Sequence, residues 1–187
     1  MFRWVRRALV VIALVVVVGG LLLALTARPD LNRTQDDVEA RWKTLRPALD
    51  QRYELLRAAS DATRAAGGPE RGITTSIDTA LSDWRRSRTA SVTGQVENAN
   101  ELEALGRRLV TTVEASGRLQ GQKAVVTPVN RFAAATVPAS ADAFNRAVRD
   151  YEGARGGSLR RPVVGLMGYD SVPSYDLPVT TTQASPT

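Results

Sequence analysis

Apolar residues form one unbroken run near the start of the chain and regularly spaced stripes along the rest of it. Residues 8–27 contain no charged side chain, and Arg6, Arg7 and Arg28 flank them. A helix of this length rises about 30 Å, which matches the hydrocarbon thickness of a bilayer. The run therefore predicts a transmembrane helix over residues 8–27, after a short basic segment of residues 1–7.

The same run can also be read as a cleaved signal peptide. The apolar region of a signal peptide is about 7–15 residues long and ends in small residues. Here the run is longer, and the only candidate cleavage sequence is Leu-Thr-Ala at residues 25–27. The length favours a signal anchor that stays in the protein. Because residues 1–7 carry three arginines and no acid, the positive-inside rule predicts a cytoplasmic N-terminus, with the remaining chain outside the cell membrane.

Beyond the anchor, apolar positions follow the three- and four-residue spacing of amphipathic helices. We predict helices over residues 34–66, 69–88, 95–116 and 122–153. Their predicted inward positions are Val38, Trp42, Leu45, Leu49, Leu56, Thr63, Ile73, Ile77, Leu81, Trp84, Val96, Leu102, Leu105, Leu109, Val113, Val137, Ala141, Phe144, Val148 and Tyr151. No segment shows strand alternation, so the sequence predicts an all-α fold: a transmembrane helix followed by an antiparallel bundle of about four helices.

Prolines, glycines and a capping sequence mark the expected ends and irregularities of these helices. Residues 34–37 (Thr-Gln-Asp-Asp) resemble a capping box that begins the first bundle helix, and the glycines at 67–68 end it. Breaks, kinks or bends are predicted at Pro29, Pro47, Pro128 and Pro138. Arg52 falls on the apolar stripe, where its stem would follow the core edge while its head reaches water.

The last part of the sequence changes in composition. Glycines between residues 153 and 157 are expected to close the bundle, and the apolar residues 162–169 to pack back on one end of it. From Ser171 onward the chain is rich in Pro, Thr and Ser. We therefore predict one helical domain over residues 28–176 and a disordered tail over residues 177–187.

Composition excludes several kinds of chemistry. The chain contains no Cys and no His, which rules out disulfides, thiolate nucleophiles, imidazole bases and His-ligated zinc. It carries 25 Lys and Arg against 19 Asp and Glu. Three of the bases lie in residues 1–7, which leaves 22 basic against 19 acidic residues, a net charge of +3 for the rest. The domain itself is therefore only mildly basic.

The polar clusters favour structural over catalytic roles. Asp36, Asp37 and Glu39 form the densest acidic cluster, and at a helix start such acids cap free amides and complement the helix dipole. A Ser–Lys dyad would need Lys43 or Lys123 buried beside a serine, but both have helix-surface spacing. No glycine loop of the phosphate-binding type is present. We predict no catalytic, cofactor-binding or metal-binding residues.

Arginines and aromatic residues mark two candidate binding regions. The densest basic region consists of Arg85, Arg86 and Arg88, with Arg64 and Arg71 earlier in the chain. It is either a solvated helix end, which we favour, or a site for anionic lipid headgroups. Trp42 and Trp84 lie on apolar stripes and are expected to pack together in the core. Tyr169 and Tyr175, near the end of the chain, are positions where a partner would dock.

Several short motifs occur in a consistent order along residues 4–175. They are Leu31-Asn32, Val38 and Trp42 as V-x-x-x-W, Arg52-Tyr53-Glu54-Leu55-Leu56, Leu105 to Leu109, Glu114-Ala115 with Leu119, Phe144-Asn145 with Val148, Tyr151-Glu152, and Val163 to Tyr169. This order resembles the LemA family, bacterial membrane proteins with one N-terminal spanning helix and an α-helical domain. Arg57 replaces a family proline and Glu152 a family asparagine, which indicates a divergent member. The resemblance implies architecture and location, and it transfers no catalytic residue.

Two functions remain open at this point. The first is a non-enzymatic scaffold or interaction module of the cell envelope. It would be held in the lipid bilayer by residues 8–27 and would bind an envelope protein or associate with itself, but not with nucleic acid. The alternative is an envelope hydrolase or peptidase that uses carboxylates or a Ser–Lys pair. An enzyme predicts a concave site with converging carboxylates, whereas the module predicts a filled core.

Overall fold

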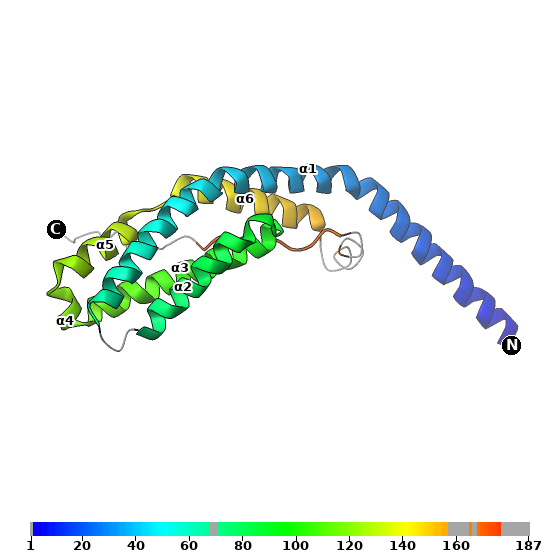
Figure 1. Ribbon diagram of the computed structural model, residues 1–187. Coiled ribbons are helices and arrows are strands. Elements are labelled where there is room, and N and C mark those ends of the chain that lie inside the picture. Colours follow the sequence, from blue (N-terminus) through cyan, green and yellow to red (C-terminus); the bar gives the residue numbers. More distant parts are fainter. Residues whose placement is uncertain (1, 68–70, 157–164, 166–167, 177–187) are drawn as a thin grey trace, which may run out of the picture. The chain divides into compact units, whose positions relative to one another are not determined.

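The chain folds into helices joined by short connections (Figure 1). The structure, a computed structural model, describes the backbone of residues 2–67, 71–156, 165 and 168–176, and their side chains except those of residues 2–27 and 71. The elements are α1 (Phe2–Ala65), α2 (Arg71–Arg86), a 3₁₀ turn η1 (Ser87–Thr89), α3 (Val92–Ala115), α4 (Gly117–Gln120), α5 (Lys123–Ala134) and α6 (Pro138–Arg155). No strand occurs in this described part, which confirms the all-α prediction.

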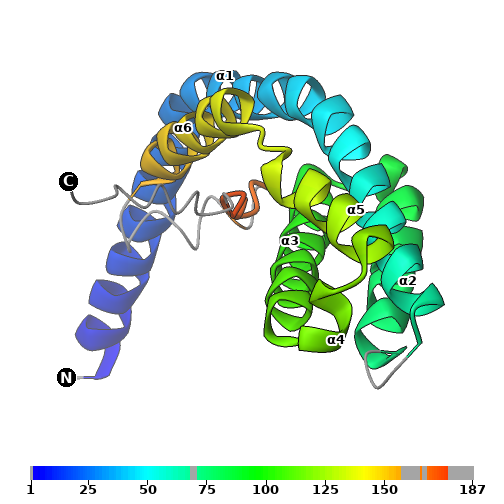
Figure 2. The ribbon, with the colours of Figure 1, turned by 90° about the vertical axis from the view of Figure 1, so that its left-hand side faces the viewer.

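The chain divides into two compact units. One consists of Met1–Val38 with Ala147–Ser171, and the other of Glu39–Arg146 with Val172–Thr187. Helices α1 and α6 each contribute residues to both. In the second unit α2 and α3 lie side by side, and α5 packs against α3 (Figure 2).

The second unit is built around an aromatic cluster. Trp42 and Trp84 meet edge to face with ring centroids 6.2 Å apart, which confirms their predicted pairing. Trp42 also lies 5.2 Å from Phe144, and Tyr53 lies 5.1 Å from Trp84, again edge to face. Such geometries add about 0.5–1.5 kcal/mol per pair to the burial of the rings. The cluster ties α1 to α2 and to the first half of α6.

The predicted apolar stripes account for most of the core. All of the predicted inward positions are buried except Leu105 and Val137, which are half-buried. In the first unit, Leu31, Val38, Val148 and Tyr151 are buried. The helical spacing of apolar residues is therefore a reliable guide to which side of each helix faces the interior.

Helix α1 differs from the prediction at its start. It runs without a break from Phe2 to Ala65 and includes both Pro29 and Pro47. A break at Pro29 and a helix start at residues 34–37 are therefore wrong. Each proline removes only one backbone donor, and the hydrogen bonds on either side keep the helix continuous. Thr34 donates its hydroxyl to the carbonyl oxygen of Asp30, 2.9 Å away, instead of capping a helix.

The acidic cluster lies inside this helix as a result. Asp36, Asp37 and Glu39 are separated from the first turn of α1 by more than 30 residues. They cannot cap free amides at a helix start, and that prediction is also wrong. The reason is that α1 continues through Pro29, so the amides near residues 34–37 are not the free amides of a helix start.

Glycine ends α1 as predicted. Gly67 has φ of 66°, a left-handed conformation in which a Cβ would be strained. Its N–H donates to the carbonyl of Arg64 at 3.1 Å, which satisfies one of the free carbonyls of the last turn. Gly156, with φ of 79°, follows the end of α6 in the same conformation.

The predicted fourth helix is two helices. Pro128 lies inside α5, whereas Pro138 is the first residue of α6. At the first helical position a proline loses no hydrogen bond, because the N–H there has no partner within the helix. The split was one of the two outcomes predicted for these prolines. The turn expected between the third and fourth helices contains the short helix α4.

Three predicted features involve residues outside the described part of the structure. The first is the predicted transmembrane helix. The backbone of residues 8–27 belongs to α1, but their side chains lie outside the described part. Among the residues that the search for membrane spans covered, no helix combines the length and the apolar character needed to cross a membrane. Most of the apolar segment 162–169 and all of the predicted tail 177–187 also lie outside the described residues.

Candidate functional site

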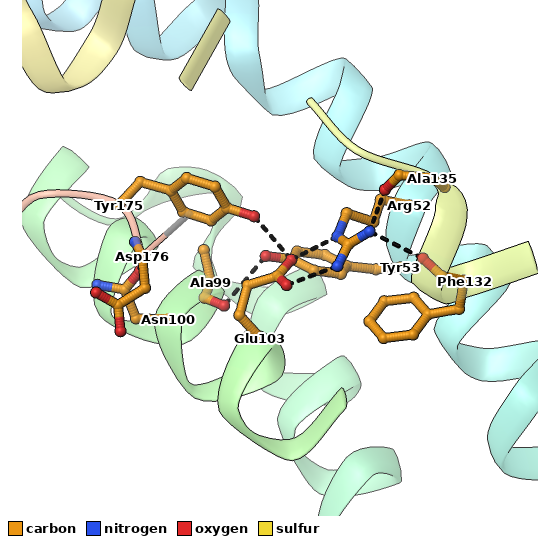
Figure 3. A network of polar contacts seen from close by, with 9 residues as sticks. All are labelled: Arg52, Tyr53, Ala99, Asn100, Glu103, Phe132, Ala135, Tyr175 and Asp176. Carbon is orange, nitrogen blue, oxygen red and sulfur yellow. Dashed lines mark hydrogen bonds and ion pairs between the residues drawn. The ribbon is translucent and has the colours of Figure 1, made fainter. Parts of the chain in front are cut away.

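A cluster of buried polar side chains lies inside the second unit, and it is the most distinctive chemical feature there. It consists of Arg52 from α1, Glu103 from α3 and Tyr175 from the C-terminal segment, and we call it the Arg52 cluster (Figure 3). The side chain of Arg52 is 3% exposed, and that of Glu103 is fully buried. Charges buried to this degree are tolerated only when they are paired and hydrogen-bonded.

Arg52 and Glu103 form a bidentate ion pair. Nε of Arg52 lies 2.7 Å from Oε1 of Glu103, and Nη2 lies 2.8 Å from Oε2. The planar guanidinium matches the carboxylate geometry, which lysine cannot do. The pair joins α1 to α3 across the core.

The remaining donors of Arg52 bind the C-terminal end of α5. Nη1 donates to the carbonyl of Phe132 at 2.9 Å and to that of Ala135. A helix C-terminus carries partial negative charge and free carbonyls, so a cation is stabilised there. The guanidinium also lies over the Phe132 ring, 4.3 Å from its centroid. One side chain thus connects α1, α3 and α5.

A glycine makes room for this arrangement. Gly106 of α3 faces the Phe132 ring, and a Cβ added to it would lie 2.7 Å from Cε1 of that ring. Any larger residue would displace Phe132, the residue on which Arg52 stacks. The close approach of α3 and α5 therefore depends on glycine at this position.

Two tyrosines complete the polar interior. Tyr175 donates its hydroxyl to Oε1 of Glu103 at 2.7 Å, and Tyr53 donates to the carbonyl of Ala99 at 3.1 Å (Figure 3). Burial raises the pKa of the Tyr53 hydroxyl well above its usual value, and burial together with the Glu103 charge raises the pKa of Tyr175. Burial alone would lower the pKa of Arg52, but its hydrogen bond and charge interaction with Glu103 raise it. The arginine is therefore permanently charged and the tyrosines neutral near pH 7.

The sequence prediction for these residues was partly wrong. Arg52 was expected to extend its head into water, but the head is buried and paired. Tyr175 was predicted as a position where a partner would dock, but its side chain is 2% exposed and packs within the chain. Glu103 was not singled out. The available signal was its place on a helical stripe with Val96, Ala99 and Gly106, all of which are buried.

Side chains also hold the backbone of residues 174–176. Asn145 of α6 donates to the carbonyl of Tyr175 at 2.9 Å and accepts from its N–H at 2.8 Å. Asn100 of α3 donates to the carbonyl of Ser174 at 2.9 Å and accepts from the N–H of Asp176 at 2.8 Å. We call Asn100, Glu103 and Asn145 together the Tyr175 site.

In the first unit, the segment before Ser171 has a different set of partners. Tyr151 donates its hydroxyl to the carbonyl of Asp170 at 2.8 Å, and Arg155 donates to the carbonyl of Tyr169 at 3.1 Å. The hydroxyl of Tyr169 donates to Oδ1 of Asn32. The Tyr169 side chain, which was predicted to meet a partner, is half-buried and bound to α1.

The predicted basic region is largely neutralised by acids. Arg88 lies 3.5 Å from Asp50, while Arg86 pairs with Asp83 and Arg64 with Asp78. Beside it is a pocket of about 260 Å³. The pocket is lined by Asp50, Gln51, Tyr53, Glu54, Leu81, Trp84, Arg85 and Arg88. Its two arginines are matched by two carboxylates, so it has no excess of one charge.

Two residues that line this pocket, Asp50 and Trp84, are joined by a hydrogen bond. Trp84 donates its indole N–H to Oδ1 of Asp50 at 2.8 Å, and Arg46 lies 4.3 Å from the centroid of the Trp84 ring. Burial lowers the pKa of Arg46, partly offset by the charge of Asp50. These contacts occupy the polar atoms of Asp50 and Trp84 with structural bonds.

The lysines considered for a Ser–Lys dyad are not enclosed. Lys43 and Lys123 are both exposed. Among the described residues, no group of three acidic side chains is close enough to hold a metal ion. The Arg52 cluster is therefore a neutralised polar core whose side chains are hydrogen-bonded to one another.

Comparison with known proteins finds no family model, no curated protein and no solved structure that matches this chain.

Proposed function

We propose that the protein is a single-pass membrane protein of the LemA type, whose helical bundle works outside the cell membrane as a non-enzymatic interaction module. Residues 8–27 would span the bilayer, with residues 1–7 in the cytoplasm. The charge-free run and its arginine-rich N-terminal side support this arrangement. The continuity of α1 from Phe2 to Ala65 supports a direct helical connection between the anchor and the bundle.

The residues that carry the LemA resemblance support a shared architecture. Val38, Trp42 and Tyr53 of α1 are buried, and so are Phe144 and Tyr151 of α6. Residues at such positions are constrained by packing, and a packing constraint preserves a motif without any catalytic role. The resemblance therefore bears on the fold, and it leaves the binding partner open.

The observation that carries the choice of binding over catalysis is the environment of Glu103. It is the only acidic side chain that is buried among the residues with described side chains. Both of its oxygens accept hydrogen bonds from Arg52, and one also accepts from Tyr175. A general base needs a free lone pair facing the substrate. The carboxylate of Glu103, the most deeply buried one described, instead connects α3 to α1.

A reporter fusion tests the proposed topology. Alkaline phosphatase fused after Thr187 should be active in intact cells, whereas green fluorescent protein at the same place should be dark. The matched control exchanges the arginines of residues 1–7 for glutamate, which should reduce the phosphatase signal. Cytoplasmic activity of the unaltered fusion would overturn the orientation. N-terminal sequencing of the mature protein distinguishes an anchor from a signal peptide, since cleavage would give a chain starting at Arg28.

Crosslinking in intact membranes tests the interaction role. A photoreactive residue in place of Lys43 or Lys123, which are both exposed, should give a discrete crosslinked product identified by mass spectrometry. The same residue placed at Leu102, which is fully buried, is the control and should give only intramolecular products. Hydrolysis of an envelope substrate by the purified chain, lost on substitution of an exposed acid, would instead support the alternative hydrolase.

A further inference from the structure

The chain holds residues 174–176 in the way that proteins hold a bound peptide. The backbone of this segment is not part of any helix. Two asparagine side chains make four hydrogen bonds with it, each one donating to a carbonyl and accepting from an N–H. An amide side chain that pairs with both backbone groups imitates a neighbouring strand and recognises an extended chain whatever its sequence.

Sequence selectivity comes from two further contacts. The Tyr175 side chain is buried, and its hydroxyl donates to Glu103 at 2.7 Å, as Figure 3 shows. The carboxylate of Asp176 lies 3.7 Å from Arg107 of α3. The site therefore combines a buried anchor for tyrosine with a cation for the acid that follows it. A buried carboxylate that needs a hydroxyl donor rejects a phenylalanine, because the oxygen would lose a partner.

Within residues 172–176, only the Tyr175 side chain is buried. Tyr175 is buried, whereas Ser174 and Asp176 are exposed and Val172 and Pro173 are half-buried. Segments attached through a single anchor and backbone bonds exchange more readily than packed helices. The three side chains of the Tyr175 site belong to helices α3 and α6 and not to the segment that they bind.

We propose that the Tyr175 site is a peptide-binding site for an extended segment in which tyrosine is followed by an acidic residue, filled in cis by residues 172–176 and in trans by the same segment of a second copy. Each copy carries both the site and a segment known to fit it. Exchange between two copies is reciprocal and gives a closed dimer. The cis segment has an effective concentration in the millimolar range, so exchange requires copies to be concentrated or the cis segment to be weakened.

Two complementary variants of the full chain test this directly. Tyr175→Ala leaves the site intact and disables the segment, whereas the double variant Asn100→Ala and Asn145→Ala does the reverse. The two variants carry different affinity tags and are mixed in equal amounts. They should form a heterodimer in which Tyr175→Ala supplies the site and the double variant supplies the segment. Neither variant alone should form a dimer. Absence of the heterodimer, with the helical circular dichroism signal of both variants unchanged, would overturn the proposal.

A synthetic peptide of residues 171–178 provides an independent measurement. It should bind Tyr175→Ala, and replacing its tyrosine with alanine or phenylalanine should weaken binding at least tenfold. If Tyr175→Ala fails to fold, Asp176→Pro replaces it in both experiments. Proline at position 176 disables the segment because it lacks the N–H that donates to Asn100. Peptide binding without a heterodimer would overturn the second copy as the occupant. No peptide binding by a folded variant would overturn the site altogether.

Discussion

The guanidinium of Arg52 and the carboxylate of Glu103 face each other in a doubly hydrogen-bonded pair, with contacts of 2.7 and 2.8 Å, in a part of the core that water does not reach. A buried pair is not in itself strongly stabilising, because both charges have lost their hydration. Removing one partner is costly, because the other charge remains buried and uncompensated.

Glu103→Gln is therefore expected to lower the free energy of unfolding by about 3–5 kcal/mol. Urea unfolding followed by tryptophan fluorescence measures it, since Trp42 and Trp84 are both buried. The matched control is Glu54→Gln, which removes the charge of an exposed residue 4.0 Å from Arg57. That change should cost less than about 1 kcal/mol. Equal effects of the two substitutions would contradict the role assigned to Glu103.

Gly106→Ala tests the close approach of α3 and α5. Alanine normally stabilises a helix relative to glycine by about 1 kcal/mol. Here the new Cβ would lie 2.7 Å from Cε1 of the Phe132 ring and closer still to Cζ, so we expect a loss of about 1–3 kcal/mol. Gly153→Ala in α6, where no atom lies within 4 Å of the new Cβ, is the control and should be neutral or stabilising. Thermal unfolding decides between these outcomes, and a stabilised Gly106→Ala would show that the ring moves freely.

Alkaline pH should destabilise the fold through its buried tyrosines. The pKa values of Tyr53 and Tyr175 are raised in the folded state, mainly by burial. A raised pKa means that the folded state retains the proton while the unfolded chain releases it above about pH 10. The contribution of these two protonated tyrosines to the free energy of unfolding is therefore complete below about pH 10. Above that pH it falls, by about 1.4 kcal/mol per pH unit for each tyrosine.

Urea unfolding between pH 9 and pH 11.5 measures this slope. Tyr175→Phe should make it shallower, although the variant starts from a lower stability because Glu103 loses a hydrogen-bond donor. Tyr169→Phe is the comparison, since Tyr169 is only half-buried. A slope unchanged by Tyr175→Phe would mean that this hydroxyl ionises as freely in the folded chain as in the unfolded one.

Pro47→Ala is expected to stabilise α1. Pro47 is exposed in the interior of this helix, where it lacks the N–H of a regular turn. Restoring that bond should raise the free energy of unfolding by about 1–3 kcal/mol. Pro138→Ala is the control, because Pro138 is the first residue of α6 and no hydrogen bond is missing there. Differential scanning calorimetry of the two variants should show a higher Tm for Pro47→Ala only.

The apolar pattern predicted the helical core well and the polar core poorly. Trp42, Trp84 and Phe144 follow from helical spacing, because burial of large apolar side chains is independent of their partners. Arg52 and Glu103 could not be placed in the same way. The charged group of a residue on an apolar stripe can either reach water or form a buried ion pair. Which of the two occurs here depends on how α1 and α3 are rotated relative to each other, and the apolar pattern does not give that rotation.

Glycine marked the end of α1 correctly, whereas proline was a mixed guide: Pro138 begins α6, but Pro29 lies inside α1. Gly67 takes a left-handed conformation that ends α1 for a steric reason. Pro29 can interrupt a helix or be absorbed by it, and its sequence neighbours do not distinguish the two. The hydrogen bonds of Asn100 and Asn145 with residues 174–176 had no sequence signal, because they join segments 30 to 76 residues apart in the chain.

The Arg52 cluster also sets the order in which the chain can be completed as it leaves the ribosome. Glu103 follows Arg52 by 51 residues, and Tyr175 follows Glu103 by a further 72. Until Glu103 is synthesised, the first helix carries an unmatched cation on the side that will face the interior. That helix must stay hydrated there, and a nascent chain that stops short of Tyr175 leaves Glu103 without its hydroxyl donor. Full desolvation of the core therefore requires a chain that has been translated beyond Tyr175.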